Sequence, residues 1–221
     1  MEDWVGAGND GFITKIYDQA GSADPLQATA ANQPQIVSSG TVLTKNGKPA
    51  ILFDGTDDYL YTSALSDTLN VYPYSFFAVG SNETSSDVGM FANIRESGSP
   101  NEGWQTALRR DIAGFAYYVD EGSTDDNLDY LALDNTNSQR LQTVTVTSGG
   151  VSELFLDGTS QDSATISECV PAVNTRLELG ALQWASLYGN IYFQEFIHFR
   201  TDENSNRTGI ETNINDHYSI Y

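Results

Sequence analysis

One stretch decides the class of fold: residues 143–159, which read TVTVTSGGVSELFLDGT. Threonine and valine alternate from Thr143 to Thr147, and a period of two gives an extended strand one apolar face. The following run, residues 152–156, is rich in apolar residues and leads into Asp157-Gly158, a pair typical of a tight hairpin turn. The stretch therefore predicts antiparallel β-structure.

Similar runs recur along the whole chain, separated by short clusters of Gly, Ser, Thr and Asn. The other candidate strands are residues 11–17, 35–37, 50–53, 59–61, 74–80, 89–94, 105–109, 113–119, 176–181 and 188–199. Helical periodicity is strongest in the tail, residues 206–221. There Ile210, Ile214 and Tyr218 (or His217) recur every four residues, after an N-cap at Asn204 or Ser205. We predict an all-β fold, a two-sheet antiparallel jelly-roll sandwich with a short C-terminal helix, as a single domain spanning residues 1–221.

The composition is strongly acidic. Ten Lys and Arg face thirty Asp and Glu, a formal net charge of −20. This balance argues against nucleic acid as a partner, because nucleic-acid binding needs clustered cations, and it disfavours an anionic membrane surface for the same reason. The 3 Trp, 12 Tyr and 10 Phe supply material for a core, which argues against disorder.

Cysteine usage and the N-terminus exclude some further classes. Cys169 is the only cysteine, so the chain forms no intrachain disulfide and no cysteine-based zinc site. The opening residues Met1-Glu2-Asp3-Trp4 show neither the basic nor the apolar region of a Sec signal peptide. The apolar runs are far shorter than the ~20 residues that span a bilayer.

Several motifs resemble, in order, the concanavalin A-like (laminin-G-like) jelly-roll domains found in bacteriophage and marine-bacterial surface proteins. The motifs that carry the resemblance are FITKIYDQAG (residues 12–21), GKPAILFDGTDDYL (47–60), SELFLDG (152–158) and YGNIYFQEFIHF (188–199). Relatives often have more chain before the opening motif, so the resemblance also implies that this chain is the C-terminal part of a longer protein.

The resemblance implies a noncatalytic, lectin-like carbohydrate-binding, adhesion or decoration module on a virion or extracellular surface. One alternative is a purely structural virion protein, such as a head fibre, decoration or tail component that acts through protein–protein contacts. A second alternative is a glycoside hydrolase or polysaccharide lyase, because similar sandwiches host such enzymes. The expected partners are a glycan or polysaccharide, other virion or surface proteins, and further copies of the chain in a homo-oligomer.

An acidic turn is the candidate metal site. Asp54, Asp57 and Asp58 place three carboxylates around Gly55. Calcium binds six to eight hard oxygen ligands, and acidic glycine-containing loops supply them. The alternative is a solvated turn in which the aspartates accept hydrogen bonds from backbone N–H groups. A second acidic segment, residues 120–129, is interpreted as an exposed loop that could also line a sugar site.

The candidate ligand surface combines aromatic and polar residues of two strands that we expect to form a hairpin around Asp111-Ile112. It consists of Trp104, Gln105, Arg109, Tyr117, Tyr118 and Asp120. Sugar sites place an aromatic ring against the apolar face of a pyranose, while neighbouring polar groups bind its hydroxyls. The alternative interpretation is that the aromatic residues belong to the core.

The sequence offers no recognisable catalytic arrangement. The Glu-x-Asp-x-Glu strand motif of retaining sandwich glycosidases is absent. Glu102, Asp120 and Glu195 are the carboxylates whose mutation would test an enzymatic role. Neither His198 nor His217 adjoins a serine or cysteine in a nucleophilic arrangement, so both are interpreted as structural or surface histidines.

Overall fold

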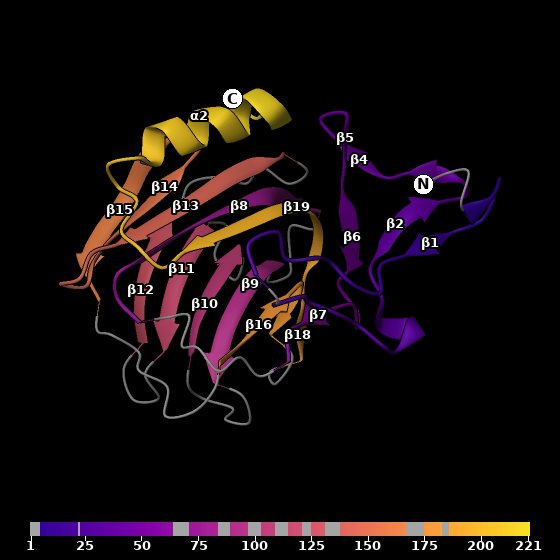
Figure 1. Cartoon of the computed structure of the whole chain (residues 1–221), viewed down its shortest axis with the longest axis horizontal. Coiled ribbons are helices and arrows are strands. Elements are labelled where there is room, and N and C mark those ends of the chain that lie inside the picture. The colour runs from indigo at the N-terminus through magenta and orange to yellow at the C-terminus, as the bar shows by residue number, and fades with distance from the viewer. Residues whose placement is uncertain are drawn as a thin grey trace.

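Two antiparallel sheets face each other in the computed structural model of the chain (Figure 1). The structure describes residues 5–21, 23–63, 71–83, 89–96, 103–108, 115–120, 125–130, 138–166, 175–182 and 186–221. The nine-stranded sheet has the order β1 (Gly11–Phe12), β2 (Gln35–Ser38), β6 (Ile51–Asp54), β19 (Asn190–Phe199), β8 (Tyr74–Asn82), β13 (Arg140–Val146), β14 (Val151–Leu156) and β15 (Thr159–Thr165), with β3 (Thr41–Val42) on β2.

The six-stranded sheet covers one face of the larger sheet. Its order is β12 (Asp125–Tyr130), β11 (Phe115–Asp120), β10 (Gly103–Leu108), β9 (Gly89–Glu96), β16 (Thr175–Leu179) and β7 (Leu60–Tyr61). Two small ribbons, β4 (Thr44–Lys45) with β5 (Lys48–Pro49) and β17 (Ala181–Leu182) with β18 (Leu187–Tyr188), complete the β-structure. A 3-10 turn, η1 (Ala30–Asn32), precedes β2. The predicted two-sheet antiparallel sandwich is confirmed.

The core lies between the two sheets, where period-two alternation delivers apolar side chains from both. Phe76 of β8, Val144 of β13 and Leu154 of β14 lie side by side in register on the larger sheet. They pack with Ile94 of β9 and Tyr117 of β11 from the smaller sheet. Because all five are fully buried, the alternation read from residues 143–147 identifies the core face of this sheet.

The other face of the nine-stranded sheet is covered by the C-terminal helix α2 (Arg207–Tyr218), which lies above it in Figure 1. Ile214 and Tyr218 are buried against Phe77 and Val79 of β8, and Ile210 packs on the same cluster. The predicted apolar stripe of the tail is therefore confirmed. The N-cap residue is Asn206 and not the predicted Asn204 or Ser205, and its side chain makes no capping hydrogen bond.

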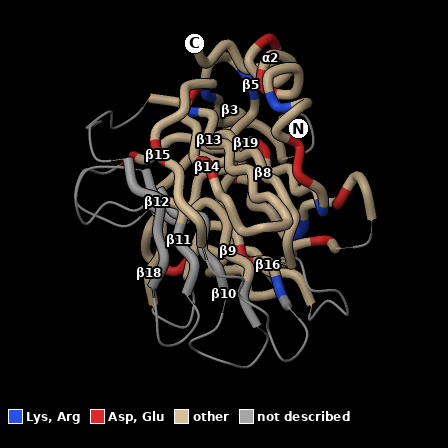
Figure 2. Tube along the Cα trace, turned by 90° about the vertical axis from the view of Figure 1, so that its left-hand side faces the viewer, with Lys and Arg blue, Asp and Glu red and all other residues tan. Residues whose placement is uncertain are grey.

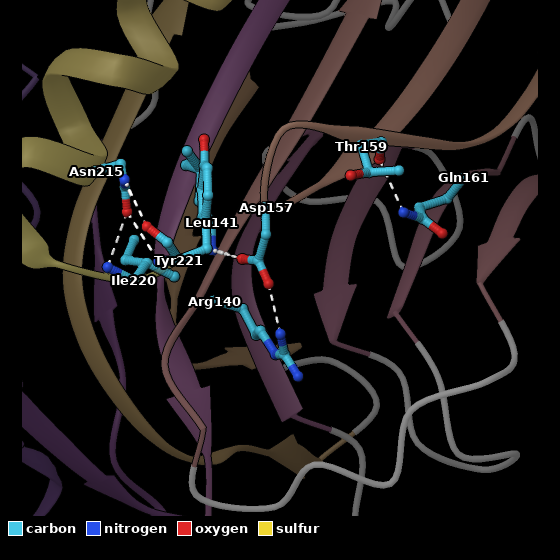
Figure 3. Close-up of polar contacts among 8 residues, drawn as sticks. All are labelled: Arg140, Leu141, Asp157, Thr159, Gln161, Asn215, Ile220 and Tyr221. Atoms are coloured by element: carbon cyan, nitrogen blue, oxygen red, sulfur yellow. Dashed lines mark hydrogen bonds and ion pairs between the residues drawn. The ribbon is translucent and has the colours of Figure 1, made fainter.

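Side-chain hydrogen bonds stabilise the end of α2 and the hairpin that joins β14 to β15 (Figure 3). Asn215 accepts the backbone N–H groups of Ile220 and Tyr221, both at 2.9 Å, which satisfies the chain after the helix. At the predicted turn, Asp157 and Gly158 adopt φ of 50° and 76°, as a two-residue hairpin requires. Asp157 accepts the N–H of Leu141 at 3.0 Å and pairs with Arg140.

The sequence-based prediction missed five strands. Three are the two-residue strands β3, β4 and β5, and the other two, β12 and β15, are polar edge strands. Residues 120–129 were expected to form one loop, but Asp120 ends β11 and residues 125–129 lie in β12. The strand β15 at the edge of the larger sheet is exposed along most of its length. Because β15 is exposed at almost every position, its sequence does not need the apolar alternation that identifies a half-buried strand. The sequence of β12, DDNLDY, also lacks a run of aliphatic residues.

Many of the charged residues that the structure describes lie outside the strands of the larger sheet. Figure 2 shows them gathered around α2 and the N-terminal segments, while the strands of the nine-stranded sheet are mostly uncharged. Within the described part of the chain, no helix has the length and apolar character needed to cross a membrane.

Candidate functional site

The strands that carry the candidate ligand surface pair with each other as expected. β10 and β11 are antiparallel neighbours, with Trp104 opposite Val119 and Gln105 opposite Tyr118. Arg109 and the turn at residues 111–112 lie outside the described residues.

The register divides the candidate residues between the two faces of the six-stranded sheet. Tyr117 is fully buried, its hydroxyl meets that of Tyr74, and its ring lies 5.8 Å from that of Phe76. Tyr117 therefore belongs to the core, which corrects its inclusion in a ligand surface. Position 104 pairs with 119, two residues from 117, and so falls on the core face of the sheet.

The other described candidate positions, 105, 118 and 120, lie on the outer face of the sheet. Two of them, 105 and 118, belong to a row of paired residues that crosses all six strands. Paired residues share a face, and the row consists of Tyr61, Glu178, Asn93, Gln105, Tyr118 and Asn127. Asp120 lies on the same face, two residues beyond Tyr118. None of the row's members is aliphatic, whereas the core-face positions next to them include Leu60, Ala92 and Leu179. Among the row members whose side chains the structure describes, this face carries an aromatic residue, Tyr61, and two polar ones, Glu178 and Asn93.

At the β7 end of this row, a buried carboxylate is held by an arginine and an amide. Glu178 is 0% exposed, and its Oε1 accepts the Arg176 Nε–H at 2.7 Å. Its Oε2 accepts the Asn93 Nδ2–H at 3.3 Å. The Arg176 guanidinium also lies 4.9 Å from the centre of the Tyr61 ring. The hydrogen bonds from Arg176 and Asn93 replace the water that the Glu178 carboxylate loses on burial, and they hold the Arg176 side chain against the sheet.

Three half-buried tyrosines from distant parts of the chain meet beside this pair. The rings of Tyr59 and Tyr61 are stacked with centroids 5.7 Å apart, and Tyr188 of β18 lies 6.4 Å from Tyr59. Figure 1 shows β7, β16 and β18 grouped at this end of the sheet. We call Tyr59, Tyr61 and Tyr188 the tyrosine cluster. Sequence reasoning missed it, because Tyr188 is brought to the other two only by the path of the chain through the fold.

The three aspartates of the candidate metal site lie next to the tyrosine cluster. Asp54, Asp57 and Asp58 can each direct a carboxylate oxygen to within 4.8 Å of the others. Asp58 is 6% exposed, and burial, followed by the nearby charge of Asp54, raises its carboxyl pKa to about 6. We call these residues the aspartate cluster.

Part of the aspartate cluster also caps its own turn. Asp54 Oδ1 accepts the N–H of Thr56 at 2.7 Å, and Asp58 Oδ2 accepts the N–H of Asp54 at 3.0 Å. These bonds are those expected of a solvated turn. They leave carboxylate oxygens available as hard ligands, so the residues fit a cation, and calcium at this position stays a prediction.

The segment that joins the two clusters, residues 57–59, is held by hydrogen bonds from side chains of an earlier part of the chain. Asn32 Nδ2 donates to the carbonyl of Asp57 at 2.9 Å, and Gln27 Nε2 donates to that of Tyr59 at 3.2 Å. Burial raises the pKa of the Tyr188 hydroxyl, and Tyr59, Asp57 and Glu178 raise it further. The two clusters therefore form one continuous surface patch at the edge of the six-stranded sheet.

Of the residues considered for catalysis, Glu195 and His198 contact other parts of the fold. Glu195 is half-buried under α2, where burial raises its carboxyl pKa and His217 and Tyr218 lower it. His198 stacks on Tyr74 with ring centroids 6.1 Å apart. Glu102 and Cys169 lie outside the described residues. Glu195 thus interacts with residues of α2, and His198 stacks on a core tyrosine.

Comparison with known proteins identifies the fold. The chain matches no family model and no curated protein. Among solved structures it is similar to the botulinum neurotoxin serotype D binding domain, with a TM-score of 0.60 and 13% identity over 92% of this chain and 51% of that one. It is also similar to the CBM40 of the Ruminococcus gnavus IT-sialidase, with a TM-score of 0.59 and 10% identity over 72% and 94% of the two chains. A third similar structure is the binding domain of botulinum neurotoxin DC in complex with SialylT, with a TM-score of 0.57 and 12% identity over 91% and 51%.

These similarities confirm the concanavalin A-like sandwich. The chain spans about half the length of the toxin domains that it matches. A phage or marine-bacterial origin gains no support from these structures, so the virion setting stays a prediction.

Proposed function

We propose that this chain is a noncatalytic glycan-binding module whose binding surface is the tyrosine cluster with Arg176. The observation that carries the proposal is the meeting of three half-buried tyrosines with a fixed guanidinium on the outer face of the six-stranded sheet. The names of two similar structures, a CBM40 and a binding domain in complex with SialylT, support a carbohydrate ligand.

The patch has the two kinds of groups that sugar recognition needs. Aromatic ring faces bind the apolar C–H face of a pyranose, and charged or amide groups bind its hydroxyls. Because the loop between the clusters is anchored by Gln27 and Asn32, little ordering accompanies binding. Affinity at a single shallow site is expected in the millimolar range, and display of many copies on a virion or cell surface would raise avidity.

The first test is binding to a glycan array, followed by calorimetry on the oligosaccharides that bind. Tyr59→Ala and Tyr188→Ala should each weaken binding about tenfold or more, since each removes a ring from the patch. Tyr17→Ala is the matched control, because Tyr17 is 69% exposed and lies outside the cluster. Equal affinity of all four proteins would contradict the proposed surface.

Two other results of these assays would redirect the assignment. No binding to any polysaccharide, together with a stable trimer in solution, would favour a structural protein that acts through protein contacts. Release of reducing sugar that disappears in Glu102→Gln, Asp120→Asn or Glu195→Gln would favour a hydrolase.

We also propose that the aspartate cluster binds Ca²⁺. Asp54, Asp57 and Asp58 would supply hard oxygen ligands, and the bound ion would neutralise carboxylates that repel one another. Calorimetry on chelator-treated protein should show calcium binding that Asp57→Asn and Asp58→Asn weaken. The same substitution at exposed Asp216 on α2 should leave it unchanged. Binding that survives in both cluster variants would place the ion elsewhere.

A further inference from the structure

The tip of the β4–β5 hairpin carries the only Asn-Gly pair of the sequence, Asn46-Gly47. Lys45 pairs with Lys48, so the two residues between them form a tight turn. Their φ angles of 46° and 72° are the positive values that a type I′ turn requires, which explains why this pair stands here. Asparagine is a thermolabile residue, and a following glycine leaves its side chain open to attack by the next backbone nitrogen.

Both groups of this reaction are accessible. Asn46 and Gly47 are exposed, and a Cβ atom at Gly47 would meet no atom within 4 Å. Within the part of the chain that the structure describes, the Gly47 N–H donates no hydrogen bond. The nitrogen that has to lose its proton is therefore not protected by the pairing of the two strands.

The Asn46 side chain also joins the hairpin to the C-terminal end of α2. Its Nδ2 donates to the carbonyl of Ser219 at 2.8 Å. Ser219 is the C-cap residue of the helix, and its own N–H donates to the carbonyl of Asn215 at 2.7 Å. A carboxylate at position 46 would have no proton to donate and would set two oxygens against each other. The reactive amide is therefore also the contact that its own conversion would break.

The base of the hairpin is held independently of this contact. Gln194 Nε2 donates to the carbonyls of Lys45 and Lys48, at 3.3 and 3.2 Å. Lys45 also forms an ion pair with Glu83, with 2.8 Å between the nitrogen and the oxygen. A change at the tip should therefore separate the turn from α2 while the two strands stay in place on the larger sheet.

We propose that Asn46 is a site of spontaneous covalent modification that releases the β4–β5 hairpin from α2. The Gly47 nitrogen forms a bond to Asn46 Cγ, the Cγ–Nδ2 bond breaks, and Nδ2 leaves as ammonia with the proton of the Gly47 nitrogen. Water then opens the cyclic imide. Attack at Cγ gives aspartate, and attack at the backbone carbonyl carbon gives isoaspartate, whose main chain runs through Cγ.

This modification needs only water, and either product adds one negative charge to the chain. It does not depend on the proposed glycan-binding function. The isoaspartate form also lengthens the turn by one main-chain carbon, which no longer fits the pairing of Lys45 with Lys48.

The test is peptide mapping by mass spectrometry after the folded protein has stood in mildly alkaline buffer. The peptide that contains Asn46 should gain the mass difference between oxygen and NH and should separate into aspartate and isoaspartate forms. Asn204 and Asn213 are internal controls, because both are exposed and each is followed by a residue with a side chain. Asn46 should convert about tenfold faster than either, since glycine hinders the attack least.

Two variants separate the chemistry from its effect. Asn46→Gln keeps an amide but would have to close a larger ring, so its peptide should gain no acidic form. Asn46→Asp has the charge of the products. Its amide hydrogens at residues 219–221 should exchange about fivefold faster than those of the unmodified protein, the factor expected for one lost hydrogen bond.

Three results would overturn the proposal. Slower conversion at Asn46 than at Asn204 would show that the exposed turn is not the reactive site. Conversion of Asn46 only in urea-unfolded protein would show that the folded turn protects the amide. Unchanged hydrogen exchange at residues 219–221 in Asn46→Asp would show that the contact with Ser219 does not hold the end of α2.

Discussion

At the scale of single residues, Asp58 shows how the fold perturbs a carboxyl group. Burial is the first cause of its raised pKa, about 6 against an ordinary 3.8, and the charge of Asp54 is the second. The folded state therefore holds a proton on Asp58 more tightly than the unfolded state. Its contribution to stability is complete at a pH below about 4 and is lost as the pH rises through 6.

Asp58→Asn should remove this pH dependence. The amide keeps an oxygen that can accept the N–H of Asp54, but it cannot ionise, so the variant should gain stability at neutral pH. A shift of about two pKa units corresponds to about 3 kcal/mol at most. Urea unfolding of both proteins between about pH 4 and 8, without calcium, measures the difference, which should grow with pH. A constant difference across this range would contradict the assigned protonation.

At the scale of secondary structure elements, two glycines occupy opposite environments. Gly209 lies in the exposed part of α2, and a Cβ atom there would meet no atom within 4 Å. Gly180 joins β16 to β17 with φ of +80°, and a Cβ atom there would overlap the Phe53 ring. The helix thus tolerates a side chain where the strand junction does not.

The same substitution should therefore have opposite effects on the free energy of unfolding. Gly209→Ala should stabilise the protein by about 0.5–1 kcal/mol, since alanine loses less backbone freedom in a helix. Gly180→Ala should destabilise it by about 2–4 kcal/mol, because it adds steric overlap to backbone strain. Denaturant titrations of the two variants give both values. A destabilised Gly209→Ala would show that the helix N-terminus is constrained by more than the contacts described above.

At the scale of the whole molecule, neither sheet can bury its apolar face without the other. One core cluster joins Phe76 and Val144 of the larger sheet to Ile94 and Tyr117 of the smaller one. A second joins Phe53 and Ile191 to Leu60 and Leu179 in the same way. We therefore expect the described chain to unfold as one cooperative unit.

Calorimetry should show a single thermal transition in which the calorimetric and van't Hoff enthalpies agree. Far-ultraviolet circular dichroism, which reports the sheets, and near-ultraviolet signals, which report aromatic packing, should change together. Two separated transitions would instead divide the chain into independent domains.

The fold could be predicted from the sequence wherever the signal was local. The alternation at residues 143–147, the Asp157-Gly158 turn and the spacing of Ile210, Ile214 and Tyr218 are patterns within a few residues of each other. The strands β12 and β15 were not predicted because their sequences are mostly polar and show no apolar alternation. The grouping of Asp54, Asp57 and Asp58 was predictable for the same reason as the turn, since they are neighbours in sequence.

The candidate ligand surface was decided by the tertiary structure. The period of two in a β-strand predicts that Tyr117 and Tyr118 lie on opposite faces of their strand. It does not predict which of the two residues lies on the core face; the structure shows that it is Tyr117. The meeting of Tyr188 with Tyr59, and of Asn93 with Glu178, depends on which strands become neighbours in the folded chain. Local sequence determines the conformation and the alternating faces of each strand. The strand order, and which face of each strand is buried, depend on burying the apolar surface of the whole chain. The residues of the patch therefore come together only in the folded sandwich.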